Sequence, residues 1–179
     1  MNIILIGYRA TGKTTLARLL ADRLGWSWVD ADVEIEERAG KSITRIFAEE
    51  GEPAFRSLEA QVIADLCRRE KLVLAAGGGA PLRPESRRLM RESGSVVWLT
   101  ARPETIFARM AADATTAGRR PNLTSRSGQD EIVHLLQKRE PVYREAAHHE
   151  VDTEGKSPQE LTSEILALLQ SQTEGEGAA

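Results

Sequence analysis

The chain has 179 residues, of which 41% are hydrophobic and 28% are charged, and its formal net charge is −3. This size predicts one globular domain, and the small negative charge argues against nucleic acid as the main partner. The single cysteine, Cys67, excludes an internal disulfide and is typical of a reducing cytoplasm. The apolar run at residues 3–6 is too short for a signal sequence, and no later run could cross a membrane. We therefore expect a cytoplasmic protein that binds no membrane.

In the first half of the chain, short apolar segments alternate with longer amphipathic segments. The apolar segments predict strands at residues 2–6, 28–30 and 72–76. The amphipathic segments predict helices at residues 13–24, 33–39, 43–50 and 53–70. Gly25, Gly40 and Gly51 directly follow three of these helices, where glycine commonly ends a helix.

The same alternation continues in the second half. It predicts strands at residues 96–99 and 150–152, and helices at residues 84–91, 103–110, 129–144 and 158–170. Residues 111–127 show no period and predict a mobile loop, and the polar, glycine-rich residues 171–179 predict a disordered tail. The whole pattern is typical of one α/β domain over residues 1–170, with a parallel sheet and crossover helices.

The motif Gly7-Tyr8-Arg9-Ala10-Thr11-Gly12-Lys13-Thr14 matches the phosphate-binding P-loop, G-x-x-x-x-G-K-[ST], at every defined position. It lies between a predicted strand and a predicted helix, as that loop requires. Its backbone N–H groups and the helix N-terminus would hold phosphates, Lys13 would contact the β- and γ-oxygens, and the Thr14 hydroxyl would bind Mg²⁺. The alternative, a glycine-containing turn without a ligand, is much less common in this context.

Two aspartates, Asp30 and Asp32, follow the second predicted strand at the edge where open α/β sheets bind ligands. One of them could serve the Mg²⁺ shell while the other faces an acceptor hydroxyl. The structural alternative is that they cap the next helix. The predicted strand at residues 72–76 leads into glycines and not into an acidic residue, which argues against a hydrolase that activates water.

Several further residues could bind ligands or could be structural. Gly77, Gly78 and Gly79 leave bare backbone that a ligand can approach, although glycines also form ordinary turns. Arg56 could bind an anion or pair with Glu59 one turn later. The arginines at 119 and 120, and Arg139, could bind phosphate and carboxylate, or could be solvated surface residues.

Taken together, these segments resemble the shikimate kinase family over roughly residues 3–169. The segments that match are the P-loop, Asp30-Ala31-Asp32, residues 46–52, residues 55–59, the three glycines, Arg120-Pro121 and residues 139–143. The P-loop interior departs from the family in lacking its usual glycine and serine, and Asn122 stands where leucine is usual. The order and spacing of the segments, more than any one of them, carry the resemblance.

The resemblance implies a nucleoside-monophosphate-kinase-like fold with a five-stranded parallel sheet flanked by helices. It also implies a substrate-binding helical region at about residues 31–60 and a lid at about residues 111–127. The implied reaction transfers the γ-phosphoryl of ATP to the 3-hydroxyl of shikimate, with Mg²⁺ as cofactor, in chorismate and aromatic amino acid biosynthesis. We expect ATP and shikimate as the only partners of a monomer.

The resemblance also implies the role of each site residue. Lys13, Asp32 and Arg120 would be catalytic, with Asp32 also contacting shikimate and acting as the proposed base. Thr14 and Asp30 would support Mg²⁺. The implied shikimate-binding residues are Asp32, Arg56, Gly77, Gly78, Gly79 and Arg139. The implied ATP-binding residues are Ala10, Thr11, Gly12, Lys13, Thr14, Thr15, Arg109, Arg120, Lys156 and Pro158.

Two other readings of the sequence remain. The chain could be another small-molecule P-loop kinase, such as a gluconate or nucleotide kinase, although the three glycines with Arg56 and Arg139 argue against both. It could also be a nucleotide-binding module that has lost catalysis. Such a loss would be expected to remove Lys13, Asp32 or one of the arginines, and all are present.

Overall fold

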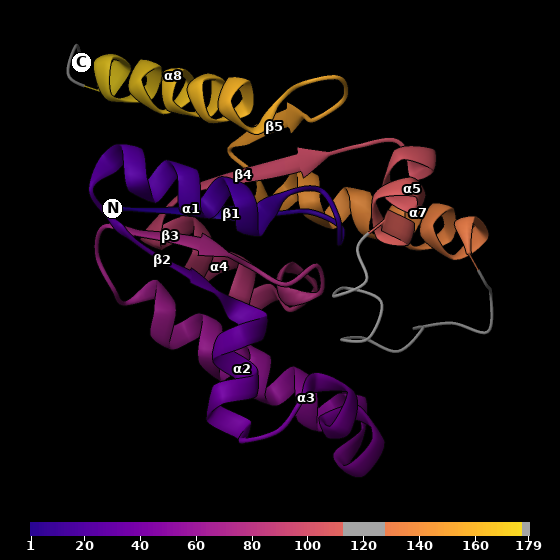
Figure 1. The fold of residues 1–179 in the computed structure, drawn as a ribbon. Helices are drawn as coiled ribbons and strands as arrows, with labels where there is room; N and C mark the ends of the chain where they lie inside the picture. The colour runs from indigo at the N-terminus through magenta and orange to yellow at the C-terminus, as the bar shows by residue number, and fades with distance from the viewer. Residues whose placement is uncertain (113–127, 177–179) are drawn as a thin grey trace.

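The computed structural model describes residues 1–112 and 128–176, with side chains described as far as residue 171. Its centre is a five-stranded parallel sheet in the order β2-β3-β1-β4-β5 (Figure 1). The strands are β1 (Asn2–Ile6), β2 (Ser27–Asp30), β3 (Leu72–Ala75), β4 (Gly94–Thr100) and β5 (His149–Asp152). The prediction of a five-stranded parallel sheet flanked by helices is confirmed.

The central strands are apolar on both sides because helices cover both faces of the sheet. In β1, Ile4 and Ile6 pack on one face against a core formed with α2, α3, α4 and α7, whose bounds follow. Ile3 and Leu5 point to the other face, where they pack against α1 and α8. Strand β2 lies at the edge of the sheet and is more exposed, with Ser27 and Trp28 open to solvent.

Eight α-helices are described, with one 3₁₀ turn after β3. The labelled α-helices are α1 (Lys13–Leu24), α2 (Ala31–Ala39), α3 (Ile43–Cys67), α4 (Pro84–Ser93), α5 (Pro103–Ala112), α7 (Gln129–Ala146) and α8 (Pro158–Glu176). The number is eight because α3 consists of two helices on either side of Gly51. The 3₁₀ turn η1 spans Ala80–Leu82. Helix α3 contains a break at Gly51, whose φ of 81° and ψ of 170° are not helical, so the two predicted helices are separate across this kink.

Several predicted boundaries need correction. Helix α3 ends at Cys67, three residues before the predicted end at residue 70, and β4 begins at Gly94, two residues earlier than predicted. Helix α2 begins at Ala31, two residues earlier than predicted, because the Asp30 side chain caps it. Ala111 and Ala112, predicted to begin the lid, complete helix α5, and the rest of the predicted lid lies outside the described residues. Helix α8 continues to Glu176, into the segment predicted to be a disordered tail. Cys67, at the end of α3, is only partly buried.

The predicted helical region at residues 31–60 contains α2 and most of α3, which extend away from the sheet in Figure 1. Strand register then determines which loops meet. Ala75 lies beside Leu5 on one side and beside Asp30 on the other. The P-loop, Asp30 and the three glycines after β3 therefore all leave the sheet at its carboxyl edge.

Candidate active site

The P-loop joins β1 to α1 through backbone conformations that its residue types permit. Gly7 has a φ of 139°, and a Cβ there would lie 2.5 Å from the carbonyl oxygen of Leu99, so a larger residue would displace β4. Gly12 has a φ of 92° and is the N-cap residue directly before α1. Ala10 is held at a φ of 61°, a conformation that costs about 1–3 kcal/mol for a residue with a Cβ. The loop is therefore held open as a cradle of N–H groups.

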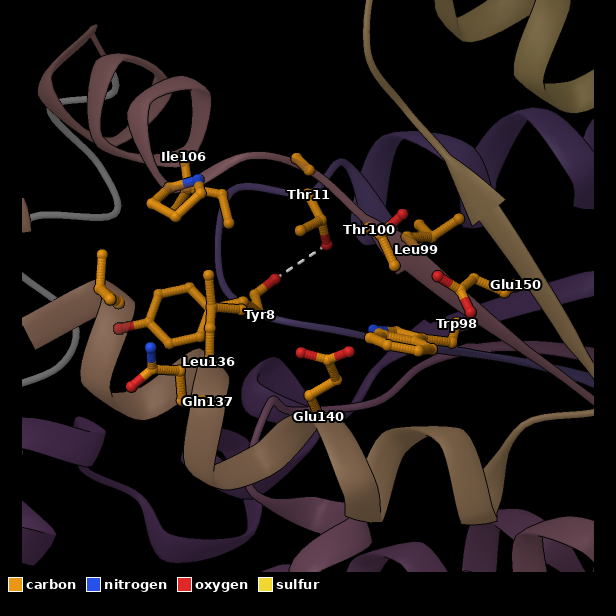
Figure 2. Close-up of a pocket in the computed structure, with 13 residues that line it drawn as sticks. Tyr8, Thr11, Trp98, Leu99, Thr100, Ile106, Leu136, Gln137, Glu140 and Glu150 are labelled. Atoms are coloured by element: carbon orange, nitrogen blue, oxygen red, sulfur yellow. Dashed lines mark hydrogen bonds between the residues drawn. The ribbon is translucent and has the colours of Figure 1, made fainter.

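Lys13 folds back over this cradle. Its ammonium donates hydrogen bonds to the carbonyl oxygens of Gly7, at 3.0 Å, and Tyr8, at 2.6 Å. The Thr11 hydroxyl donates to the same Tyr8 carbonyl at 2.8 Å, and Figure 2 shows this bond. A cation is thus held at the mouth of the loop, where phosphate oxygens can compete for it.

Asp30 caps the next helix, as one of the two alternatives left open by the sequence predicts. Its Oδ1 accepts the backbone N–H of Asp32 at 2.9 Å and so caps α2, while its Oδ2 accepts the Thr14 hydroxyl at 2.5 Å. The cap places Asp32 in the first turn of α2, where its side chain is half-buried. Helix capping is thus the means by which the chain positions both aspartates beside the P-loop.

A cavity of about 270 Å³ lies beside the P-loop, between α1, α5 and the loop before α8. Most of the residues predicted to bind ATP line it: Ala10, Thr11, Gly12, Thr15, Arg109, Lys156 and Pro158. The guanidinium of Arg109 donates to the Thr153 hydroxyl at 3.1 Å and to the Ala10 carbonyl at 3.4 Å. Arg109 therefore joins the P-loop to the opposite wall of this cavity.

Sequence reasoning missed Thr153, which lines that wall, and its neighbour Glu154. Thr153 is buried and its hydroxyl accepts a hydrogen bond from Arg109. Glu154, the next residue, holds the loop after β5 in place. The Glu154 carboxylate accepts the backbone N–H of Arg102 at 2.8 Å and the Thr105 hydroxyl at 3.1 Å, at the start of α5. The hydrogen bond from the Arg102 backbone is the largest cause that lowers the pKa of Glu154. No local motif marks these residues, because their partners lie about fifty positions away.

The three glycines, called the glycine strip below, form the other side of the site. The Gly78 carbonyl accepts the Tyr143 hydroxyl at 2.6 Å, and Nη1 of Arg139 lies 3.5 Å from the same oxygen. Arg139 is only 6% exposed, and its guanidinium lies 5.9 Å from the centre of the Tyr8 ring. In the described part of the chain, no carboxylate forms an ion pair with Arg139. A buried, unpaired guanidinium is costly unless an anion joins it, so this position favours an anionic ligand.

Arg56 reaches the strip from α3. A Cβ on Gly79 would overlap the Arg56 guanidinium, so glycine is required for this close approach. The predicted pair with Glu59 is present, at 2.7 Å, but Glu59 is 3% exposed and the pair is not a surface contact. Within the residues that the structure describes, one oxygen of Glu59 is buried without a hydrogen-bond partner. The buried carboxylate of Glu59 therefore holds the Arg56 guanidinium close to Gly79.

A second cavity, of about 320 Å³, lies on the far side of the P-loop between β4, α5 and α7 (Figure 2). The Tyr8 ring lines this cavity beside Leu136, and Trp98 and Glu140 line it on the side facing Tyr8. Tyr8 itself is 2% exposed. The sequence marked Tyr8 only as an unusual P-loop residue, whereas the structure places its ring between the phosphate cradle and Arg139.

The structure thus brings together most of the predicted site residues: Lys13, Thr14, Asp30, Asp32, Arg56, the glycine strip and Arg139. Arg109, Lys156 and Pro158 line the adjoining cavity. The predicted lid residue Arg120, with its neighbour at 119, lies outside the described residues. No helix in the described part of the chain is long and apolar enough to cross a membrane.

A P-loop at the carboxyl edge of a five-stranded parallel sheet, facing an arginine-lined acceptor site, defines a P-loop kinase that acts on a small molecule. The family model described as shikimate kinase matches residues 9–170 of the chain. The chain belongs to the shikimate kinase family.

Individual relatives agree with this assignment. A shikimate kinase from Rhodopirellula baltica is 46% identical over 95% of this chain and 91% of its own length. A solved shikimate kinase from Acinetobacter baumannii, in complex with shikimate, is 37% identical, with a TM-score of 0.89 over 96% of this chain and 93% of that one. A solved gluconokinase from Sinorhizobium meliloti is 16% identical with a TM-score of 0.55 over 97% and 94%, a likeness of fold alone.

Proposed function

We propose that the chain transfers the γ-phosphoryl group of ATP to the 3-hydroxyl of shikimate, giving shikimate 3-phosphate and ADP. This step belongs to the synthesis of chorismate and the aromatic amino acids. The observation that carries the assignment to these residues is the buried guanidinium of Arg139, which faces the glycine strip beside a P-loop. A planar guanidinium binds a carboxylate with two parallel hydrogen bonds, which selects an acid over a neutral polyol.

The acceptor would lie between Arg139 and Arg56, over the glycine strip. The two arginines come from α7 and α3 and both contact the strip, so a carboxylate there could be held from two sides. Asp32, at the start of α2, would then bind the acceptor hydroxyls and take the proton of the attacking one. Phosphoryl transfer passes through a loose transition state, so positioning of the hydroxyl matters more than the strength of this base.

Thr14 and Asp30 suit a magnesium ion. A hydroxyl and a carboxylate are the hard oxygen donors that Mg²⁺ prefers, and it usually takes only one or two such ligands alongside phosphate oxygens and water. Their 2.5 Å contact holds both groups at the start of α1, next to the phosphate cradle. When bound there, the ion would supply positive charge beside the β- and γ-phosphates of ATP, where the bond to the transferred group breaks.

Lys13 would exchange its carbonyl partners for phosphate oxygens when ATP binds. The two carbonyls of Gly7 and Tyr8 keep its ammonium close to the position it needs, so little side-chain ordering is left for the binding step. Arg120 is proposed to bring a further positive charge to the transferring group. Arg109, Lys156 and Pro158 would enclose the adenine in the neighbouring cavity.

The proposal includes a monomeric protein in the cytoplasm that has ATP and shikimate as partners and no nucleic acid. The proposed acceptor site is formed by residues of one chain, which supports a monomer. Size-exclusion chromatography with light scattering would test it. A mass near twice 19.7 kDa would contradict the monomer.

A coupled assay of ADP release tests the proposed reaction. We expect release to require both Mg²⁺ and shikimate, with little turnover on water alone. Gluconate and nucleoside monophosphates serve as comparison acceptors at the same concentration, and neither should support turnover. Equal ADP release with and without shikimate would overturn the assignment, and faster release with gluconate would favour the other small-molecule kinases.

A further inference from the structure

The peptide group between Gly78 and Gly79 is held by α7 in one orientation. The Tyr143 hydroxyl donates a 2.6 Å hydrogen bond to the Gly78 carbonyl. This carbonyl and the N–H of Gly79 belong to one planar trans peptide, so they point in opposite directions. A contact that fixes the carbonyl toward α7 therefore directs the Gly79 N–H away from α7.

The other two carbonyls of the glycine strip are also occupied within the chain. The Gly77 carbonyl accepts the Ala80 N–H at 3.0 Å, and the Gly79 carbonyl accepts the Leu82 N–H at 3.0 Å. In the described part of the chain, no group accepts a hydrogen bond from the N–H of Gly78 or Gly79. Among the described residues, the strip thus has two N–H groups without an acceptor and three carbonyls that each already accept a hydrogen bond, which suits a carboxylate or hydroxyl oxygen of the substrate.

Tyr143 is held tightly enough to set this orientation. Its side chain is fully buried, and its ring centre lies 5.9 Å from that of Trp98. It lies one turn after Arg139 on α7, so the hydroxyl and the guanidinium approach the same Gly78 oxygen from one helix face. Arg139 is 3.5 Å from that oxygen, at the limit of hydrogen bonding, so Tyr143 is the main partner.

We propose that Tyr143 is a positioning residue for the acceptor. It binds the Gly78 carbonyl and so directs the Gly79 N–H into the acceptor site, and it leaves the Arg139 guanidinium free to bind the substrate carboxylate. Without the hydroxyl, the Gly78 carbonyl has Arg139 as its nearest donor, and the arginine would turn toward the carbonyl and away from the ligand. This inference rests on the proposed function, because it concerns how shikimate is held.

The test is Tyr143→Phe, which removes one oxygen and keeps the ring that fills the core. We expect the equilibrium Kd for shikimate, measured without ATP, to rise roughly two- to tenfold, as for loss of one neutral hydrogen bond. The KM for shikimate should rise by the same factor, while kcat and the affinity for a non-hydrolysable ATP analogue stay within about twofold.

Ser93→Ala is the matched control. The Ser93 hydroxyl also donates to a backbone carbonyl, that of Met90 at 3.0 Å, but at the end of α4 and away from the glycine strip. This variant should change shikimate binding less than twofold. A Tyr143→Phe variant with an unchanged shikimate Kd would overturn the proposal. Equal weakening of shikimate and the ATP analogue would also overturn it, since that pattern indicates a general structural role.

A measurement on the unaltered protein does not depend on the folding of the variant. In ¹⁵N-labelled protein, addition of shikimate should shift the backbone amide resonance of Gly79 more than that of Gly40, a glycine remote from the site. An unmoved Gly79 resonance in a protein that phosphorylates shikimate would overturn the role of Tyr143 and leave the proposed function intact. Failure to phosphorylate shikimate would instead contradict the proposed function.

Discussion

At the scale of single residues, the site depends on a few charged side chains that the protein already holds in position before a ligand binds. Lys13 rests on two carbonyls of its own loop, and Arg139 is buried beside the glycine strip without a carboxylate partner in the described part of the chain. Each arrangement lowers the free-energy cost of ordering a side chain when the substrate binds.

Replacement of Lys13 tests the phosphate cradle. Lys13→Ala should lower kcat/KM for ATP by at least about a hundredfold, because it removes the P-loop cation that is proposed to reach the β- and γ-phosphates. The side chain is half-exposed, so the fold should persist with little change in Tm. Coupled-assay kinetics and a thermal melt provide the two readouts. Near-normal activity in a folded variant would show that the cradle has been misassigned.

Arg139, proposed to bind the shikimate carboxylate, and Arg120, proposed to act on the transferring phosphoryl group, should respond in opposite ways. Arg139→Ala should raise the KM for shikimate about ten- to a hundredfold, from loss of a contact contributing about 1.5–3 kcal/mol. Arg120→Ala should lower kcat by about a thousandfold, near the lower end of the effects of arginine fingers, because its charge is needed most in the transition state.

Equilibrium binding of shikimate without ATP separates these effects. Arg120→Ala should leave the shikimate Kd nearly unchanged, whereas Arg139→Ala should weaken it by the same factor as the KM. The reverse pattern would mean that the two roles are exchanged. A neutral Arg120→Ala variant would indicate instead that the arginine at 119 acts on the phosphate.

At the scale of elements, α7 has more functions than its sequence suggests. One face carries Arg139 and Tyr143 toward the glycine strip, and its C-terminus is tied to α4 and β4. Arg91 of α4 donates to the carbonyls of residues 145 to 147 at the end of α7, and His148 then contacts β4. The position of the proposed acceptor site is therefore set partly by contacts at the C-terminal end of α7, within one turn of Tyr143.

His148 makes this connection sensitive to pH. Its Nδ1 accepts the Val96 N–H at 3.0 Å, which requires the neutral ring. Partial burial and then the nearby charges of Arg91 and His149 lower the pKa of His148 below its ordinary value. The unfolded chain therefore binds the proton more readily than the folded protein. The stabilisation is fully present above about pH 6.5 and is lost as pH falls toward the lower pKa of the folded state.

Urea denaturation between pH 5 and pH 8 measures this effect. In His148→Asn, Oδ1 can accept the same N–H without titrating, so the variant should lose less stability than the natural protein as pH falls from 7 to 5. Carboxylates titrate in both proteins and cancel in the comparison. Identical slopes for the two proteins would show that His148 does not contribute.

At the scale of the whole molecule, the proposed acceptor site joins parts of the chain that are far apart in the sequence. Residues of α3, the glycine strip and α7 approach one another there, so a bound ligand adds contacts between them. A ligand that binds only the folded state stabilises it by an amount that grows with the logarithm of its concentration. Thermal stability therefore reports binding independently of catalysis.

Shikimate at about a hundred times its Kd should add about 2.7 kcal/mol to the unfolding free energy. For a domain of this size, this corresponds to a rise in Tm of roughly 5–10 °C, which differential scanning fluorimetry can measure. Gluconate should produce no rise, because it is the ligand of the competing assignment. Arg139→Ala at the same shikimate concentration should show a much smaller rise, and a full rise in that variant would place the carboxylate elsewhere.

The sequence by itself determined the sheet strands, most helix boundaries and the phosphate cradle. These features depend on neighbouring residues: Gly7 to Thr14 are contiguous, and the stop at Gly25 is a local preference for positive φ. The same holds for the kink at Gly51, where a single glycine interrupts the helical pattern. Errors remained at helix ends, such as the start of α2, because the cap by Asp30 includes residues that periodicity alone does not count.

Only the tertiary structure decided which polar groups share a site. Tyr143 and Gly78 are 65 positions apart, and Arg109 and Thr153 are 44 apart. It also decided that Glu59 is buried beneath Arg56 and that the Tyr8 ring lies under Arg139. Such contacts follow from the strand order β2-β3-β1-β4-β5, which brings distant loops to one edge of the sheet. No short stretch of sequence records that order, because it results from packing of the whole core.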